Sequence, residues 1–142
     1  PVCIMHIQGE PETMQEQPEY RNVLREVSEF LTGRIRAAEK AGIMAHDIIL
    51  DPGFGFGKNL EHNLRLLASL EQLQALGHPL LVGMSRKSML GHITGREVEE
   101  RLPASLAAAT ISAMKGASII RVHDVRETVD AVKVATAVKE TV

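Results

Sequence analysis

Polar and charged side chains stand directly after four short apolar runs in this sequence. The runs are residues 2–7, 48–50, 80–83 and 119–122. They lack the alternation of polar and apolar residues that marks a half-exposed strand, so each run indicates a strand buried on both faces of a parallel sheet. Because ligands bind at the carboxyl ends of parallel strands, the residues after each run are the first candidates for chemistry.

The segment after the second run, residues 51–59, combines a carboxylate with three glycines. Asp51 can accept hydrogen bonds from adjacent N–H donors, such as those of an aminopyrimidinone ring, and the glycines let a ligand approach the backbone. A Walker A loop would need Gly and Ser or Thr where Pro52 and Asn59 stand, and a dinucleotide-binding fingerprint would need Gly where Lys58 stands. Nucleotide triphosphates and dinucleotides are therefore disfavoured as ligands. A simple turn at the strand exit remains the alternative.

Cations follow the third run and lie at the end of the fourth. Arg86, Lys87 and Ser88 could hold a carboxylate, a phosphate or a ring carbonyl, with N–H groups of the next helix adding donors. A solvated charged turn is the alternative there. Arg121 and His123 are two residues apart, so an extended strand directs both to the same side. If that side is interior, the guanidinium needs an anion such as phosphate; a structural Arg–carboxylate pair is the alternative.

The histidines and the cysteine show no metal-binding or nucleophile pattern. His6, after the first run, is more typical of a hydrogen-bonded structural histidine than of a ligand, and no set of His, Cys and carboxylates has metal-ligand spacing. Cys3 lies within a strand and lacks a basic neighbour, which predicts an inert core thiol. The remaining histidines are expected on the surface: His46, His62, His78 and His92.

Helical segments separate the predicted strands and follow the last one. They are expected between Pro18 and Gly42, from Asn59 to Gly77, from Pro103 to Gly116, and from Asp124 onward, with a short helix and a polar loop over residues 88–101. Apolar residues three or four positions apart mark the buried side of each helix. The predicted buried stripes are Val23, Val27, Phe30, Leu31 and Ile35; Leu60, Leu64, Leu67 and Leu70; and Val125, Val129 and Val132. Asp124 and Glu127 form a capping-box-like pair.

Composition and charge exclude several classes of partner. The net charge is -2, which gives no electrostatic case for nucleic acid or an anionic membrane surface. No run approaches the roughly 18 apolar residues of a membrane span. Small molecules are therefore favoured as ligands. The single cysteine cannot form an internal disulfide, which favours a reducing, cytoplasmic setting.

Residues 1–142 contain no repeat, low-complexity tract or linker and are predicted to form a single unit. Four strand–helix units make half of a (β/α)₈ TIM barrel of the α/β class, whose usual length is about 250 residues. An open, doubly wound sheet is the alternative, which periodicity cannot separate from the half barrel. Because Pro1 leads straight into an apolar run, we expect the chain to be a piece of a longer protein.

Taken together, residues 5–9, 51–58, 83–88 and 121–124 resemble the second half of the bacterial dihydropteroate synthases. The four segments read Met-His-Ile-Gln-Gly, Asp-Pro-Gly-Phe-Gly-Phe-Gly-Lys, Gly-Met-Ser-Arg-Lys-Ser and Arg-Val-His-Asp, in the order and spacing of that family. The resemblance implies a pterin-binding TIM barrel, of which this chain carries the last four βα units. It also implies a transferase of folate biosynthesis, in which p-aminobenzoate displaces pyrophosphate from 6-hydroxymethyl-7,8-dihydropterin pyrophosphate to give 7,8-dihydropteroate.

The resemblance further implies roles for single residues. The residues implied to bind the pterin are Asp51, Lys87, Met5 and Gly83. Those implied to bind p-aminobenzoate, or a sulfonamide that mimics it, are Phe56, Lys87 and Ser88. The implied catalytic residues are Lys87, Arg121 and His123, of which the last two bind the pyrophosphate and stabilise its charge as it leaves.

The family's cofactor is Mg²⁺, and the resemblance implies that its protein ligand lies in the other half of the barrel rather than in this chain. The chain alone is therefore expected to be inactive. A homodimer is also implied, formed through later helices such as residues 104–114. Two alternatives remain: the pterin-binding domain of a folate-dependent methyltransferase, and a non-catalytic half-barrel module that serves binding or assembly.

Overall fold

The computed structural model describes residues 1–142, along which strands and helices alternate. The strands are β1 (Val2–Met5), β2 (Ile48–Asp51), β3 (Leu81–Val82) and β4 (Ile119–Ile120). The α-helices are α1 (Val23–Lys40), α2 (Leu60–Ala68), α3 (Ser88–Thr94), α4 (Leu102–Met114) and α5 (Val125–Glu140). Short 3₁₀ segments are η1 (Ala45–Asp47), η2 (Leu70–Leu76) and η3 (Val98–Glu100). Every predicted apolar run contains a strand, so the α/β class is confirmed.

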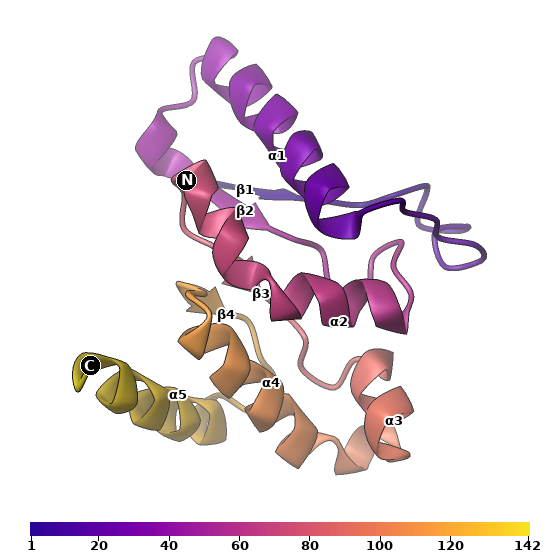
Figure 1. The fold of residues 1–142 in the computed structure, drawn as a ribbon, viewed down its shortest axis with the longest axis vertical. Coiled ribbons are helices and arrows are strands. Elements are labelled where there is room, and N and C mark those ends of the chain that lie inside the picture. Colours follow the sequence, from indigo (N-terminus) through magenta and orange to yellow (C-terminus); the bar gives the residue numbers. More distant parts are fainter.

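The strands lie in chain order and are all parallel. β1 pairs with β2, with Met5 opposite Asp51, and β3 pairs with β4, with Leu81 opposite Ile119. A parallel bridge between Leu50 and Leu80 joins the two pairs. Figure 1 shows α1 at the top, α2 in the middle, and α3, α4 and α5 side by side in the lower part.

The two faces of the strands differ. Ile48 and Leu50 of β2 are fully buried in the core that runs from α1 across β2 and β3 to α4. Asp51 lies on the opposite face, and its register partner Met5 shares that face. Cys3 is on this face too, two residues before Met5. The prediction that Cys3 is a core thiol is wrong, because the core covers only the other face and Cys3 is exposed.

Helix α1 follows its predicted pattern closely. Its buried residues are Val23, Val27, Leu31 and Ile35. Asn22 is the N-cap: its side-chain oxygen accepts a hydrogen bond from the Arg25 backbone N–H at 3.0 Å, and Glu26 accepts one from the Asn22 N–H at 3.0 Å. This reciprocal pair starts the helix because it satisfies N–H groups that have no partner in the first turn.

Helix α2 begins where the sequence predicts and buries most of its predicted stripe. Asn59 and His62 form a capping box. Leu67 and Leu70 are buried and Leu60 packs against the core, whereas Leu64 is 41% exposed. Within α2 the buried side is centred on Asn63, Leu66 and Leu67, so Leu64 lies beyond its edge. The prediction assumed one regular helix to Gly77, but the α-helix ends at Ala68 and the tighter η2 follows.

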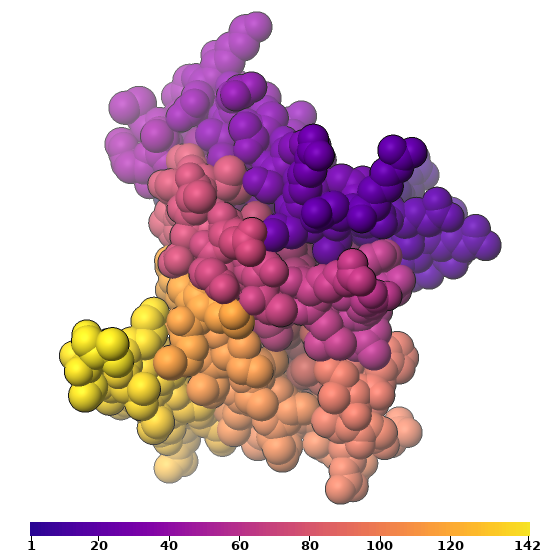
Figure 2. Space-filling model, in the orientation of Figure 1, coloured from indigo at the N-terminus to yellow at the C-terminus, as the bar shows by residue number.

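Helix α5 also departs from its predicted stripe. It buries Thr128 and Ala135 against α4, while Val125 is 60% exposed and Val129 is 43% exposed. Small buried residues of α4 allow the two helices to pack closely, namely Ser105, Ala108, Ala109, Ser112 and Ala113. Figure 2 shows α5, in yellow, protruding from the body of the molecule. No helix here combines the length and the apolar character that crossing a membrane requires.

Candidate functional site

Asp51 ends β2 and lies half-buried on the face that it shares with Met5. Its Oδ1 accepts a hydrogen bond of 2.7 Å from the Gly53 backbone N–H, so the predicted strand-exit turn is present. No protein donor contacts Oδ2. Burial raises the pKa of the Asp51 carboxyl above its ordinary value, against the lowering effects of the Gly53 N–H and of nearby Lys87. Asp51 thus combines a local turn with an acceptor open to a ligand.

The loop from Gly53 to Lys58 is held by side chains from distant segments. The Gly55 N–H donates to Asn63 Oδ1 at 3.0 Å, and the Gly57 N–H donates to Gln15 Oε1 at 2.7 Å. The Tyr20 hydroxyl donates to the Gly57 carbonyl at 2.8 Å. Because each of these contacts satisfies a backbone group of the loop, the loop is pre-organised rather than free to follow a ligand.

Lys87 reaches this loop from the end of β3. Its Nζ donates to the Phe54 carbonyl at 2.6 Å and lies 4.8 Å from the centroid of the Phe56 ring, a cation–π distance. Burial lowers the pKa of Lys87, and Arg121 lowers it further, whereas Asp51 raises it. The ammonium therefore joins the loops after β2 and β3 and carries positive charge into the space between them.

Ser85 and His123 connect the loops after β3 and β4. His123 Nδ1 lies 2.9 Å from Ser85 Oγ, and the His123 backbone N–H also approaches this oxygen, at 3.3 Å. Arg121 is exposed and forms no ion pair, so the structural Arg–carboxylate pair that was the alternative for this residue is not present. Gly83 lies against Arg121, whose Cβ would be 3.7 Å from a Cβ placed on the glycine.

Two cavities meet at Lys87. One of about 90 Å³ is lined by Gly83, Ser85, Lys87, Arg121, Val122 and His123. The other, of about 300 Å³, has Lys87 and Ser88 among its lining residues, together with Gln15 and Gly55. The structure thus brings Gly83, Lys87, Arg121 and His123 around the first cavity. It places Ser88 at the second, and Asp51, Met5 and Phe56 line neither.

Four residues at the site were not assigned a part in it from the sequence: Gln15, Tyr20, Lys58 and Asn63. Each contacts the glycine-rich loop, and Lys58 belongs to it. Lys58 carried a sequence signal, because a lysine directly after three glycines at a strand end is placed to reach backbone carbonyls. Gln15, Tyr20 and Asn63 carried none, since their contacts join segments that only the fold brings together. His6 is buried and hydrogen-bonded, as predicted.

Comparison with known proteins fits this arrangement. The sequence model of the family described as pterin binding enzyme matches residues 1–123. The chain belongs to the pterin-binding enzyme family. It is 56% identical over 137 residues to the dihydropteroate synthase of Escherichia coli. This alignment covers 96% of this chain and 49% of that protein. The chain thus spans about half the length of the curated relatives it matches.

Solved structures of family members superpose on the whole fold. A Yersinia pestis dihydropteroate synthase in a sulfonamide drug complex matches 100% of this chain and 52% of its own, with a TM-score of 0.98 and 48% identity. The Xanthomonas albilineans dihydropteroate synthase in complex with 7,8-dihydropteroate matches 98% of this chain and 49% of its own, with a TM-score of 0.90 and 47% identity. The fold of this chain is therefore that of half of such an enzyme.

Proposed function

We propose that this chain is the C-terminal half of a dihydropteroate synthase, which joins 6-hydroxymethyl-7,8-dihydropterin pyrophosphate to p-aminobenzoate and releases pyrophosphate. The observation that carries the proposal is the half-buried Asp51 carboxylate, with Oδ2 open to a ligand, close enough to the Lys87 ammonium for the charge of each to shift the pKa of the other. The high identity to dihydropteroate synthases, one of them solved with 7,8-dihydropteroate, supports it.

Asp51 is proposed to hold the pterin. A carboxylate accepts from two adjacent N–H groups of an aminopyrimidinone ring, and such charge-assisted hydrogen bonds are about twice as strong as neutral ones. Met5 stands opposite Asp51 in the strand register and gives the ring an apolar neighbour. Gly83 lines the 90 Å³ cavity and leaves room that a larger side chain would take. Lys87 adds a donor for the polar edge of the ring.

The p-aminobenzoate is proposed to lie between Lys87, Phe56 and Ser88. The Phe56 ring beneath the Lys87 ammonium offers an apolar surface for the benzoate ring. Ser88 starts α3 and is exposed, so its hydroxyl can donate to the benzoate carboxylate. A sulfonamide of similar shape would meet the same three side chains.

Arg121 and His123 are proposed to bind the pyrophosphate. Both are exposed at the end of β4, and no carboxylate of the chain occupies the Arg121 guanidinium. In the reaction the aniline nitrogen forms a bond to the pterin methylene carbon while the C–O bond to pyrophosphate breaks, and the amine then loses a proton. The guanidinium fork and the imidazole stabilise the charge that grows on the departing oxygen.

Mg²⁺ is not assigned to any residue of this chain. No group of three or more His, Cys, Asp or Glu side chains lies close enough together to hold a metal ion. The donor set needed for Mg²⁺ is thus not formed by these residues, and no step above is assigned to the ion. That the metal ligand lies in the other half of the barrel stays a prediction, as does the inactivity of this chain alone.

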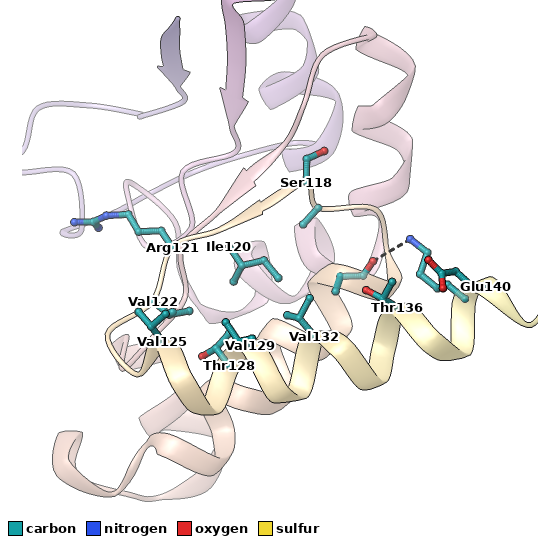
Figure 3. A pocket seen from close by; sticks show the side chains of 13 residues that line it. Ser118, Ile120, Arg121, Val122, Val125, Thr128, Val129, Val132, Thr136 and Glu140 are labelled. Carbon is teal, nitrogen blue, oxygen red and sulfur yellow. Dashed lines mark hydrogen bonds between the residues drawn. The ribbon is translucent and has the colours of Figure 1, made fainter.

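We also propose that residues 1–142 are one unit, the last four βα units of an eight-stranded barrel. The chain order of the parallel strands supports this, as does the lack of a partner at the outer edges of β1 and β4. Beside β4, an apolar groove of about 880 Å³ runs along α5. Figure 3 shows Val125, Val129 and Val132 on the side of α5 that faces Ile120. A further βα unit would cover this groove and pair with β4.

The homodimer stays a prediction. Ile111 and Met114 are exposed on α4, within the helix named for this contact, and could take part in it. The non-catalytic half-barrel module is disfavoured, because Lys87, Arg121 and His123 share one cavity. The methyltransferase alternative differs in its ligand, a methylated folate.

Calorimetry on the complete protein tests the proposal. Here the complete protein means residues 1–142 joined to the part of the Escherichia coli relative that they do not cover. Wild type, Asp51→Ala and Arg121→Ala would be titrated with pterin pyrophosphate in the presence of Mg²⁺. We expect each substitution to weaken binding by about 2 to 4 kcal/mol, because it strips a partner from a buried polar group of the ligand. Arg126→Ala, on the exposed side of α5, is the matched control.

Unchanged binding in both site variants, with the fold intact, would refute the assignment of these residues. Tight binding of a methylated folate, with no affinity for pterin pyrophosphate, would favour the methyltransferase instead. Formation of dihydropteroate from the two substrates is the direct measure of the activity.

A further inference from the structure

Lys58 is the last residue of the glycine-rich loop and is 1% exposed. Its Nζ lies 2.9 Å from His6 Nδ1, and donates to the Gly53 carbonyl at 2.8 Å and to the Phe56 carbonyl at 3.1 Å. An ammonium has three N–H donors and no acceptor, so these three partners use all of its hydrogen bonds. Lys58 therefore has no donor left for a substrate, although it belongs to the loop of the site.

The two carbonyls that Lys58 binds delimit one turn. Gly53 and Phe56 are also joined by a backbone hydrogen bond, in which the Phe56 N–H donates to the Gly53 carbonyl at 3.0 Å. Within this turn, the Phe54 carbonyl accepts from Lys87 at 2.6 Å. Two lysines thus bind the same four residues. Lys58 does so with a side chain that is almost fully buried, and Lys87 with one that also lines the 90 Å³ cavity; both lysines line the 300 Å³ cavity.

His6 fixes the position of the Lys58 ammonium. The His6 ring is buried and packs edge-on against Phe30, with 4.9 Å between ring centroids, and its Nδ1 faces Lys58. The His6 backbone N–H donates to the Asp51 carbonyl at 3.0 Å, which ties the residue to the end of β2. The loops after β1 and β2 therefore meet at the His6–Lys58 contact.

A lysine at this position carries a cost that an apolar residue would not. Burial is the main cause that lowers the pKa of Lys58 to about 7; Asp51 opposes this effect and the charge of Lys87 adds to it. A methionine of similar length would fill the same volume without this cost. It would leave the Gly53 and Phe56 carbonyls without the donor that shapes the turn.

We infer that Lys58, held by His6, is a positioning residue for the p-aminobenzoate site, since it sets the shape of the turn from Gly53 to Phe56 that carries the Phe56 ring and anchors Lys87. The inference rests on the proposed function. Lys58 acts only through Phe56 and Lys87 and does not touch substrate itself.

Steady-state kinetics of the complete protein test this role. Lys58→Met is expected to raise the KM for p-aminobenzoate by about tenfold, and the KM for pterin pyrophosphate by no more than about twofold. This asymmetry is expected because Phe56 is assigned to p-aminobenzoate alone, whereas the pterin is also held by Asp51 and Gly83, whose side-chain or cavity contacts do not include the Gly53 and Phe56 carbonyls. Lys115→Met is the matched control, since Lys115 also donates to a backbone carbonyl, that of Ala68, far from the site.

A variant that removes fewer contacts than Lys58→Met guards against loss of the fold. His6→Leu removes one of the three partners of Lys58 and leaves both carbonyl contacts, so a smaller rise in the same KM, about threefold, is expected. Equal changes in both KM values, or no change while the variant melts like wild type, overturn the inference. A complete wild-type protein that forms no dihydropteroate overturns the proposed function first, and the inference with it.

Discussion

Arg86 and Asp124 join the loops after β3 and β4 through two parallel contacts. Arg86 Nη2 lies 2.8 Å from Asp124 Oδ1, and Nε lies 3.3 Å from Oδ2. Arg86 has a positive φ of 59°, and its N–H donates to Ser105 Oγ while its carbonyl accepts from Arg101. The Asp124 carboxylate, which the sequence predicts as a helix cap, thus pairs with Arg86 instead, and α5 starts without a side-chain cap.

Asp124→Asn is expected to lower the free energy of unfolding by about 1 kcal/mol or less, because the pair is partly exposed and such pairs contribute little. The effect on catalysis should be larger, since Lys87 and His123 are the chain neighbours of the two partners. We expect kcat/KM of the complete protein to fall about tenfold or more, which corresponds to roughly 1.4 kcal/mol. Chemical denaturation and initial rates measure the two effects. A loss of stability without a loss of rate would contradict this coupling.

The stability of the chain should depend on pH through Lys58. Its pKa is lowered from 10.5 to about 7, so between these values the unfolded state binds a proton that the folded state does not. The contribution of Lys58 to the free energy of unfolding therefore increases as pH rises through this window and decreases as pH falls toward 7. Denaturant titrations from pH 7 to about 9.5 should show a steeper rise for wild type than for Lys58→Met.

The titration of two other groups limits the pH range of that measurement. Burial raises the pKa of Tyr20 to about 12, so stability from Tyr20 is lost only as pH rises above its ordinary value of 10. Burial lowers the pKa of His6 from 6.5 to about 4, so its contribution is lost as pH falls through that window. Lys87 and Asp51 face the same region and are present in both variants, so their effects cancel to first order. Parallel slopes for the two proteins would contradict a lowered pKa of Lys58.

The contact between Lys58 and His6 can adapt to this titration. A charged ammonium donates to a bare His6 Nδ1, whereas a neutral amine keeps two donors for the carbonyls and can accept from a protonated Nδ1. Nitrogen-15 NMR of the His6 ring should therefore show the proton moving from Nε2 to Nδ1 as Lys58 deprotonates. A ring whose tautomer does not change with pH would show that the two groups titrate independently.

Gly53→Ala should destabilise the fold far more than an alanine at another glycine of positive φ. At Gly53 a Cβ would collide with the His6 carbonyl oxygen, which belongs to the backbone and cannot turn away. At Gly95 the φ is similar, 70° against 74°, but nothing lies within 4 Å of a Cβ. We expect about 1 kcal/mol for Gly95→Ala from backbone strain alone, and at least about 3 kcal/mol for Gly53→Ala. Thermal melting distinguishes the two, and equal costs would mean that the loop relaxes easily.

The groove along α5 offers a test of the half barrel. Val129→Glu puts a charge into the groove, whereas Val134→Glu puts one on α5 outside it. Both side chains are exposed in this chain, so neither change should alter its own melting by more than about 0.5 kcal/mol. Val129→Glu should weaken association with a separately prepared amino-terminal half by about tenfold or more, because burying an unpaired charge is costly. Equal affinities for both variants would leave the groove without a role in barrel assembly.

The sequence predicts well those features that depend on neighbouring residues. The strands follow from short apolar runs, and Asn59 starts α2 because a side-chain cap acts within one turn. The order of the strand-end residues Asp51, Lys87 and Arg121 follows from the same reasoning, because parallel strands place their carboxyl ends together.

Features that depend on contacts between distant segments escaped prediction. His6 and Lys58 are separated by 52 positions, and Gln15 reaches Gly57 across 42. No periodicity reports such pairs. The prediction of the buried side of α5 was also wrong. Small residues of α4 pack against Thr128 and Ala135 of α5 instead. The predicted valine stripe lines the groove beside β4, where no segment of these 142 residues covers it.

Cys3 gives the chain a chemical reporter of its own assembly. It is the single thiol, and it lies exposed on the face of β1 that also carries Met5. In a closed barrel this face would line the interior, where a thiol reagent cannot reach. Partial burial and the charge of Asp51 raise the pKa of Cys3, so labelling requires alkaline buffer. Under those conditions the alkylation rate of one side chain would report what fraction of the molecules are closed barrels.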